Sequence, residues 1–179
     1  MKKARWSLLL PLASAVVFAA AAAPHPFVYA RLARGELSGR DRKAILDTVR
    51  LFDRIYEDFY ASGGGAAMID AFPATKNVKH HVFRDVGFLR DEKLVLVYDL
   101  ADLTPIDVKQ TGADTAEALV YEEWNYLYQH AADRSTAANL KGMGQGFRYR
   151  LRQERGRWIV TGWDFEDVKP TRRDKGFVY

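Results

Sequence analysis

The chain of 179 residues contains no cysteine. Disulfide bonds, thiolate metal sites and cysteine nucleophiles are therefore excluded, and the fold must be stabilised by its packed core alone. Histidine is scarce too, at four residues. The one adjacent pair is His80-His81, and on a strand neighbouring side chains point to opposite faces, so the pair is not expected to chelate a metal. We predict no metal site and no cofactor.

Acidic residues are missing from residues 1–30, which instead combine three early basic residues with an uncharged run of 18 residues, Trp6 to Ala23. This pattern is typical of a signal peptide. Small residues before the cut favour cleavage after Ala30, with cleavage near Ala22 as a second site. The alternative is an uncleaved anchor, although a bilayer span needs roughly 20 apolar residues. A cleaved protein would be periplasmic or secreted, whereas an anchored one would stay on the inner membrane with its domain outside the cytoplasm.

Much of the basic excess lies in that same segment. The whole sequence has 27 Lys and Arg against 23 Asp and Glu, and removal of residues 1–30 leaves 24 against 23. Nucleic-acid-binding domains need a basic excess of their own, so no nucleic-acid partner is predicted. Contact with a membrane is expected only if the N-terminal segment stays uncleaved.

The rest of the chain predicts one α+β domain. Residues 31–40 form a polar lead-in, and a helix is expected over residues 39–61. Its apolar stripe steps by three and four residues and consists of Ile45, Val49, Phe52, Tyr56 and Phe59. The glycines after Ser62 end this helix, and residues 66–72 are expected to form a second, short one.

After the predicted helices, the hydrophobicity of the sequence alternates with a period of two residues, which predicts strands. We expect one bent strand or two short strands over 78–89, a covered central strand over 94–100, an edge strand over 104–111 and a long strand over 115–129. Pro105 cannot donate to a sheet, which favours the edge position. Residues 130–142 are predicted as a loop, and residues 169–179 as a polar C-terminal tail.

Residues 143–168 read as a β-hairpin around the turn Arg155-Gly156. Pairing of Glu154 with Arg157 would fix the register. One face then carries Phe147, Tyr149, Leu151, Trp158 and Val160. The other carries Arg148, Arg150, Arg152, Ile159, Thr161, Trp163 and Phe165. The first face is apolar enough to form the core. The second mixes arginine with aromatic residues.

The helix at 41–61 and the last two strands, with the run Glu154-Arg155-Gly156-Arg157-Trp158-Ile159-Val160, resemble the NTF2-like superfamily. This superfamily is also called SnoaL-like or ketosteroid-isomerase-like. The resemblance covers most of residues 41–168 and implies a long helix packed on a curved antiparallel sheet, together forming a cone. Its members include isomerases, dehydratases, transport factors and assembly modules of secretion systems. The catalytic motif of the isomerases is not found in this sequence.

Asp99 and Tyr56 are the candidates for acid–base chemistry. Asp99 shares a strand face with Val95 and Val97, and partial burial would raise its pKa enough for a general base. The plainer interpretation is a structural aspartate at a strand end and a core tyrosine. In an NTF2-like cone, the residues expected to line a ligand pocket are Tyr56, Phe59, Tyr149 and Trp158.

Two other motifs suggest chemistry but are given structural interpretations. The acidic clusters Glu122-Glu123 and 164–167 are expected to pair with arginines or face solvent, because strand alternation separates neighbours. Residues 142–146 resemble a glycine-rich phosphate loop, but they lead into a strand rather than a helix.

The arginine–aromatic face of the hairpin is the predicted partner surface. We expect it to include Arg148, Arg150, Trp163, Phe165 and Trp124, with Arg148 stacked on Trp163. Arginine and large aromatic residues are enriched in interface centres, so this face is expected to form a homodimer or to dock another envelope protein. The function predicted overall is binding of a partner protein or a small apolar ligand by an exported, non-catalytic domain. The alternative is a small lyase or isomerase with Asp99 as its base.

Overall fold

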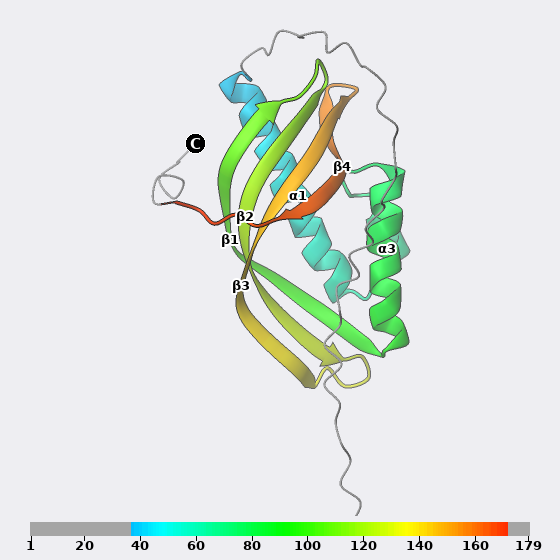
Figure 1. Cartoon of the computed structure of the whole chain (residues 1–179). Coiled ribbons are helices and arrows are strands. Elements are labelled where there is room, and N and C mark those ends of the chain that lie inside the picture. The colour runs from blue at the N-terminus through cyan, green and yellow to red at the C-terminus, as the bar shows by residue number, and fades with distance from the viewer. Residues whose placement is uncertain (1–36, 172–179) are drawn as a thin grey trace, which may run out of the picture. The chain divides into compact units, whose positions relative to one another are not determined.

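The computed structural model describes residues 37–171. The predicted signal peptide or anchor, most of the lead-in and the end of the tail lie outside the described residues. Within them, three helices and a four-stranded antiparallel sheet follow one another in the chain, and the strands pair in the order β1-β2-β3-β4. The predicted α+β class, with a long helix on a curved sheet, is therefore confirmed (Figure 1).

Helix α1 spans Gly39–Ala61 as predicted. The Ser38 hydroxyl accepts a hydrogen bond from the backbone N–H of Asp41 at 3.1 Å, which caps the first turn. The apolar stripe is buried, with Ile45, Val49 and Phe59 fully inaccessible. A short helix α2, Ala66–Ile69, follows the glycine loop. Among the strands, α1 packs mainly against β1.

The strand predicted over 78–89 is wrong, because these residues form helix α3, Lys76–Asp91. The buried residues Val78, Val82 and Val86 are four apart, which fits one face of a helix. Val78 and Val82 are also an even number of residues apart, so they fit the predicted strand as well. Before α3, the chain pairs with β4 through the Val160 backbone, which donates to Pro73 O at 2.7 Å and accepts from Thr75 N at 2.9 Å.

The sheet consists of β1 Leu94–Gln110, β2 Thr115–His130, β3 Thr136–Glu154 and β4 Arg157–Glu166. The two strands predicted at 94–100 and 104–111 are one strand with two irregularities, and 94–100 lies at the sheet edge rather than at its centre. Most of the predicted loop 130–142 belongs to β3. Since β4 pairs with β3 only between Gly146 and Glu154, the lower part of the sheet in Figure 1 contains β1, β2 and β3 alone.

The hairpin turn and its first pairs are confirmed. Arg155 and Gly156 both have positive φ, at 50° and 76°, and Glu154 pairs with Arg157. The predicted core face is buried at Tyr149, Leu151, Trp158 and Val160. The register then shifts by one residue, because Leu151 pairs with Val160 whereas Arg150 pairs with Gly162. Thr161 is the extra residue, and its hydroxyl donates to the Arg150 carbonyl at 3.1 Å.

Beyond this bulge, each side chain of β4 points to the face opposite the one predicted. Trp163 lies opposite Tyr149 rather than Arg148, so it points to the face that α1 covers, the inner face. Its ring is 5.6 Å from that of Phe52 on α1. The predicted stacking of Arg148 on Trp163 is therefore wrong.

Candidate functional site

The inner face holds a pair of buried carboxyl groups joined by a tyrosine. Asp53 comes from α1, Glu122 from β2 and Tyr149 from β3. The Tyr149 hydroxyl lies 2.9 Å from Asp53 Oδ1 and 2.9 Å from Glu122 Oε1. Trp124 Nε1–H donates to Glu122 Oε2 at 2.8 Å. Asp53 is 2% exposed and Glu122 is 1% exposed.

If both contacts of the Tyr149 hydroxyl are hydrogen bonds, this group holds an extra proton. The Tyr149 hydroxyl has one hydrogen and can donate it to only one of the two carboxyl groups. The second short contact is a hydrogen bond only if the other carboxyl is protonated and donates to the tyrosine oxygen. Burial raises the pKa of Glu122 to about 7. Burial, followed by the charge of Glu122, raises the pKa of Asp53 well above its usual range.

The same group is sealed from solvent. Asp53, Glu122, Trp124 and Tyr149 are each less than a tenth exposed. Asp53 Oδ2 is buried and has no hydrogen-bond partner among the described residues. A carboxyl pair of this kind can store a proton and tie α1 to the sheet, but it does not present an acid or a base to a bound molecule.

Sequence analysis missed this pair, although both residues carry a signal. Asp53 lies four residues after Val49 and so falls within the apolar stripe of α1. Glu122 continues the alternation of the buried residues Ala116, Ala118 and Val120 on β2. The predicted pairing of Glu122 with an arginine or with solvent is wrong.

Asp99, the predicted general base, is exposed on the outer face. Its neighbour Tyr98 takes the inner position, where its ring lies 5.1 Å from that of Tyr56. Asn125 Nδ2–H donates to Asp99 Oδ2 at 2.9 Å, and Asn125 Oδ1 accepts from Gly142 N–H at 3.1 Å. Asp99 thus holds the asparagine that supports the irregular pairing of β2 with β3. The expectation of partial burial is wrong.

Tyr56 belongs to an aromatic cluster on the inner face. Its hydroxyl donates to the Tyr60 hydroxyl at 3.0 Å. Burial raises the pKa of Tyr56 well above its ordinary value, so this phenol stays protonated. Of the other residues predicted to line a ligand pocket, Phe59, Tyr149 and Trp158 lie in the buried core.

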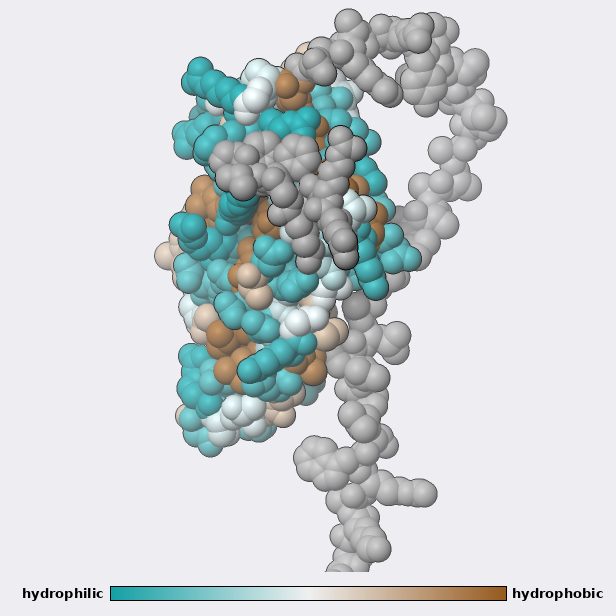
Figure 2. All heavy atoms as spheres, turned by 90° about the vertical axis from the view of Figure 1, so that its left-hand side faces the viewer, coloured by the Kyte–Doolittle hydropathy of each residue, from teal (hydrophilic) through white to brown (hydrophobic). Residues whose placement is uncertain are grey.

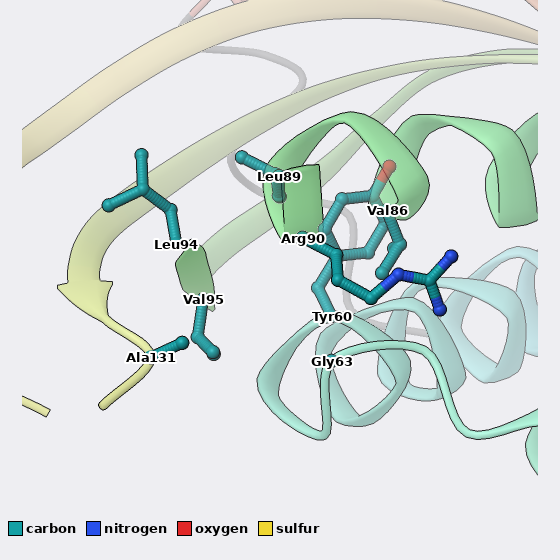
Figure 3. Close-up of a pocket in the computed structure, with 8 residues that line it drawn as sticks. All are labelled: Tyr60, Gly63, Val86, Leu89, Arg90, Leu94, Val95 and Ala131. Atoms are coloured by element: carbon teal, nitrogen blue, oxygen red, sulfur yellow. The ribbon is translucent and has the colours of Figure 1, made fainter. Parts of the chain in front are cut away.

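The described pocket lies elsewhere, at the ends of α1 and α3 beside the start of β1 (Figure 3). Its volume is about 210 Å³. It is lined by Tyr60, Gly63, Val86, Leu89, Arg90, Leu94, Val95 and Ala131. Neither carboxyl of the buried pair is among these residues. The ionisable groups at this pocket are one phenol and one guanidinium, which suit binding rather than proton transfer.

The residues of the predicted partner surface are split between the two faces of the sheet. Arg148 and Arg150 lie on the outer face in ion pairs, with Arg148 bound to Glu166 at 2.6 Å and to Glu117 at 3.2 Å, and Arg150 bound to Asp164. Trp163 and the buried Trp124 lie on the inner face. The side of the domain seen in Figure 2 is mostly hydrophilic, with apolar residues in small separate groups.

Apolar exposure is instead found on the inner side of β3 and its neighbours. Leu140 is 45% exposed, Met143 48% and Phe165 66%. Leu140 pairs with Tyr126, and Phe165 pairs with Phe147, whose ring is 5.3 Å away. We call Tyr126, Leu140, Met143, Phe147 and Phe165 the open strip. Of this strip, sequence analysis assigned Phe165 to a partner surface, and it missed Leu140 because residues 130–142 were predicted to be a loop.

Gly144 and Gly146 allow close packing on the outer face, whereas Gly142 has open space around it and a positive φ of 63°. A Cβ at Gly144 would overlap the Tyr121 hydroxyl, and one at Gly146 would lie 2.5 Å from the Glu166 carbonyl. His81, predicted to lie on a strand, lies on α3 with its Nε2 3.4 Å from Asp85 Oδ2. Residues 37–171 contain no group of three or more side chains placed to hold a metal ion.

In this range no helix is long and apolar enough to cross a membrane. No family model matches the chain, and no curated protein matches it in sequence. Solved structures do match. The intermembrane-space region of the chloroplast protein ARC6 is 13% identical, with a TM-score of 0.57, covering 73% of this chain and 98% of that one.

Two bacterial structures match more distantly, each at 11% identity. Aln2 from a Streptomyces species has a TM-score of 0.45, covering 74% of this chain and 93% of that one. A protein with a cystatin-like fold from Nostoc punctiforme has a TM-score of 0.40, covering 73% and 93%. Likeness at such identities concerns the fold alone. The helix packed on a curved four-stranded sheet is the architecture of the NTF2-like, or cystatin-like, fold.

Proposed function

We propose that this protein is an exported, non-catalytic domain of the cell envelope that binds a partner protein through the open strip. The observation that carries the proposal is the exposure of Leu140, Met143 and Phe165 on one side of the sheet. Contiguous exposed apolar surface on a soluble domain marks interaction sites. The described contacts of α1 fall mainly on β1, which leaves this part of β3 without a helix over it.

The charges on the two faces of the sheet favour the open strip, rather than the outer face, as the binding surface. The outer face pairs its arginines with Glu117, Asp164 and Glu166. Breaking such pairs to dock a partner would leave charges uncompensated. The strip offers apolar side chains whose burial is favourable at roughly 25 cal/mol per Å².

Binding is favoured over catalysis because none of the candidate acid–base carboxyl groups lines the described pocket. Asp53 and Glu122 lie in the sealed interior. Asp99, the base of the lyase or isomerase alternative, faces outward and is hydrogen-bonded to Asn125. Export follows from the sequence of residues 1–30, which would place the domain in the periplasm, outside the cell or on an inner-membrane anchor.

Site-specific photo-crosslinking in the producing cells tests the binding surface. A crosslinker at Met143 should give one defined adduct, whereas one at Asn139, which is exposed on the same strand and pairs with Leu127 on the opposite face, should not. The exchange Met143→Glu should abolish co-purification of the same protein while leaving the thermal midpoint unchanged. An adduct of two copies of this chain, with a dimer by light scattering, would identify the partner as a second copy. Equal adducts from both positions would contradict the proposal.

Export has its own test. Residues 1–35 fused to a reporter that is active only outside the cytoplasm should give activity. N-terminal sequencing should begin at Arg31 if the segment is cleaved as predicted. A protein that begins at Met1 and is recovered with membranes would support the anchored form instead.

A further inference from the structure

We infer that the pocket of Figure 3 binds a small amphipathic anion, a carboxylate on a short apolar chain. This site is separate from the open strip, and the inference does not depend on the proposed partner. The pocket combines apolar walls with one charged side chain, Arg90. Pockets that orient small ligands have this composition, a mostly apolar lining with a few polar groups.

The walls are preformed. Tyr60, Val86 and Val95 are buried, so their positions are fixed by the core. The loop after α1 closes one side through Gly63 and Gly64, which have φ of 74° and 84°. A Cβ at Gly64 would lie 2.7 Å from Val86 Cγ1, so the loop backbone packs directly on α3. A ligand would enter without the cost of ordering these walls.

Among the lining residues, the guanidinium of Arg90 is the charged group with donors to spare, and the Tyr60 hydroxyl supplies a neutral donor beside it. Gly63 N–H donates to Tyr60 O at 3.0 Å, and Ala131 N–H donates to Lys93 O at 2.8 Å. The Tyr60 hydroxyl accepts from Tyr56. Leu94 and Val95 are paired with β2. Arg90, by contrast, makes no side-chain hydrogen bond or ion pair with any residue of the described range 37–171.

These properties define the ligand class. An arginine with free donors recognises a carboxylate through two parallel hydrogen bonds. The next three residues in the chain, Asp91, Glu92 and Lys93, bring two negative charges and one positive charge, so the segment 90–93 is neutral as a whole. A monoanion is therefore favoured over a dianion such as phosphate. The volume of about 210 Å³ is below the usual range for drug-sized ligands, which limits the apolar part to a short chain.

Titration of the ¹⁵N-labelled protein, as recovered after expression of the full chain, tests the site with octanoate and 1-octanol as probes. Amide shifts should concentrate at Gly63, Val95 and Ala131. Octanoate should bind about tenfold more tightly than octanol, as expected for a charge-assisted hydrogen bond. Arg90→Gln should lower the affinity for octanoate to that for octanol. The control Arg157→Gln, which changes an exposed arginine at the β3–β4 turn, should change neither affinity.

A second pair of variants tests the pocket itself. Ala131→Trp should fill the mouth and abolish binding of both probes, whereas Ala132→Trp, one residue further along the same exposed turn, should not. Met143→Glu should leave octanoate binding unchanged, which separates this site from the open strip. Equal affinity of wild type for both probes, binding that survives Ala131→Trp, or no shifts up to about 10 mM octanoate would each overturn the inference.

Discussion

The Tyr149 hydroxyl on β3 lies 2.9 Å from the Asp53 carboxylate on α1, and this contact joins the long helix to the middle of the sheet. The same hydroxyl contacts Glu122 on β2, so three elements meet at one oxygen. Buried acidic groups are normally paired with cations, whereas this group is held by a phenol, an indole and a shared proton. The stability of the domain therefore depends on the protonation of this cluster.

The first prediction concerns pH. In the folded state burial raises the pKa of Glu122 to about 7, whereas the unfolded chain releases this proton near about 4.3. The folded state thus binds more protons than the unfolded state between these values. Its stability is fully present below the unfolded pKa and is lost as the pH rises through about 7.

Glu122→Gln removes this titration and keeps the shape of the side chain. Between about pH 5 and pH 8, the wild-type free energy of unfolding should fall by about 2 kcal/mol more than that of the variant. Urea unfolding across the range measures the difference. Glu123→Gln, the next residue on the outer side of the strand, should follow the wild type. Parallel curves for wild type and Glu122→Gln would show that the pKa of Glu122 is not raised in the folded state.

The second prediction concerns the bridging hydroxyl. Tyr149→Phe leaves Asp53 without a hydrogen-bond partner among the described residues, because its Oδ2 already has none. An unsatisfied buried carboxyl should cost about 1–3 kcal/mol. Adding Asp53→Leu to the Tyr149→Phe variant should recover part of that loss, since the buried Asp53 carboxyl is then removed and only Glu122 Oε1 has lost a partner. Tyr121→Phe, a tyrosine on the outer face, serves as the control, and a purely additive double variant would refute the coupling.

The third prediction concerns the core face of the hairpin. Trp158 is buried with Tyr149, Leu151 and Val160, as predicted from the alternation. Trp158→Ala should lower the free energy of unfolding by roughly 3–5 kcal/mol, the range for a large aromatic in a core. Trp163→Ala should cost less, because Trp163 is only half-buried. A thermal midpoint unaffected by Trp158→Ala would contradict the observed register.

The hairpin also shows where prediction from sequence succeeds and stops. Alternation and the Arg155-Gly156 turn determine the pairs near the turn, because local sterics fix both. The bulge at Thr161 has one local signal, the following Gly162 inside the strand, but a glycine alone does not say which residue is the extra one. One extra residue moves Trp163 from the outer face to the inner face, and the predicted partner surface changes with it.

Helix α3 illustrates a different limit. Its residues satisfy a period of two and a period of four at once, and only the fold selects the helix. The buried acid pair was missed for a third reason. Each carboxylate lies on an apolar face that the sequence does show, but the pairing of helix with sheet that brings Asp53 to Glu122 is a tertiary contact.

The last prediction concerns the glycines of β3. A Cβ at Gly146 would meet the Glu166 carbonyl and the Val168 side chain, and a backbone carbonyl cannot move without breaking the β3–β4 pairing. At Gly144 the added methyl would meet the Tyr121 hydroxyl, the mobile end of a long side chain. Gly146→Ala should therefore cost about 1–3 kcal/mol, the range for overpacking, and Gly144→Ala clearly less.

Urea unfolding of the two variants measures this ranking. In a Tyr121→Ala background, Gly144→Ala should no longer lower the free energy of unfolding, whereas Gly146→Ala should lower it as much as before. The reason is that the two added methyl groups meet different partners. If Gly146→Ala proved the milder of the two, the chain after β4 would not pack against Gly146 in solution. The outer face near Gly146 would then be exposed to solvent. The argument that the open strip on the inner face is the binding surface would be weaker, because it assumes a well-packed outer face.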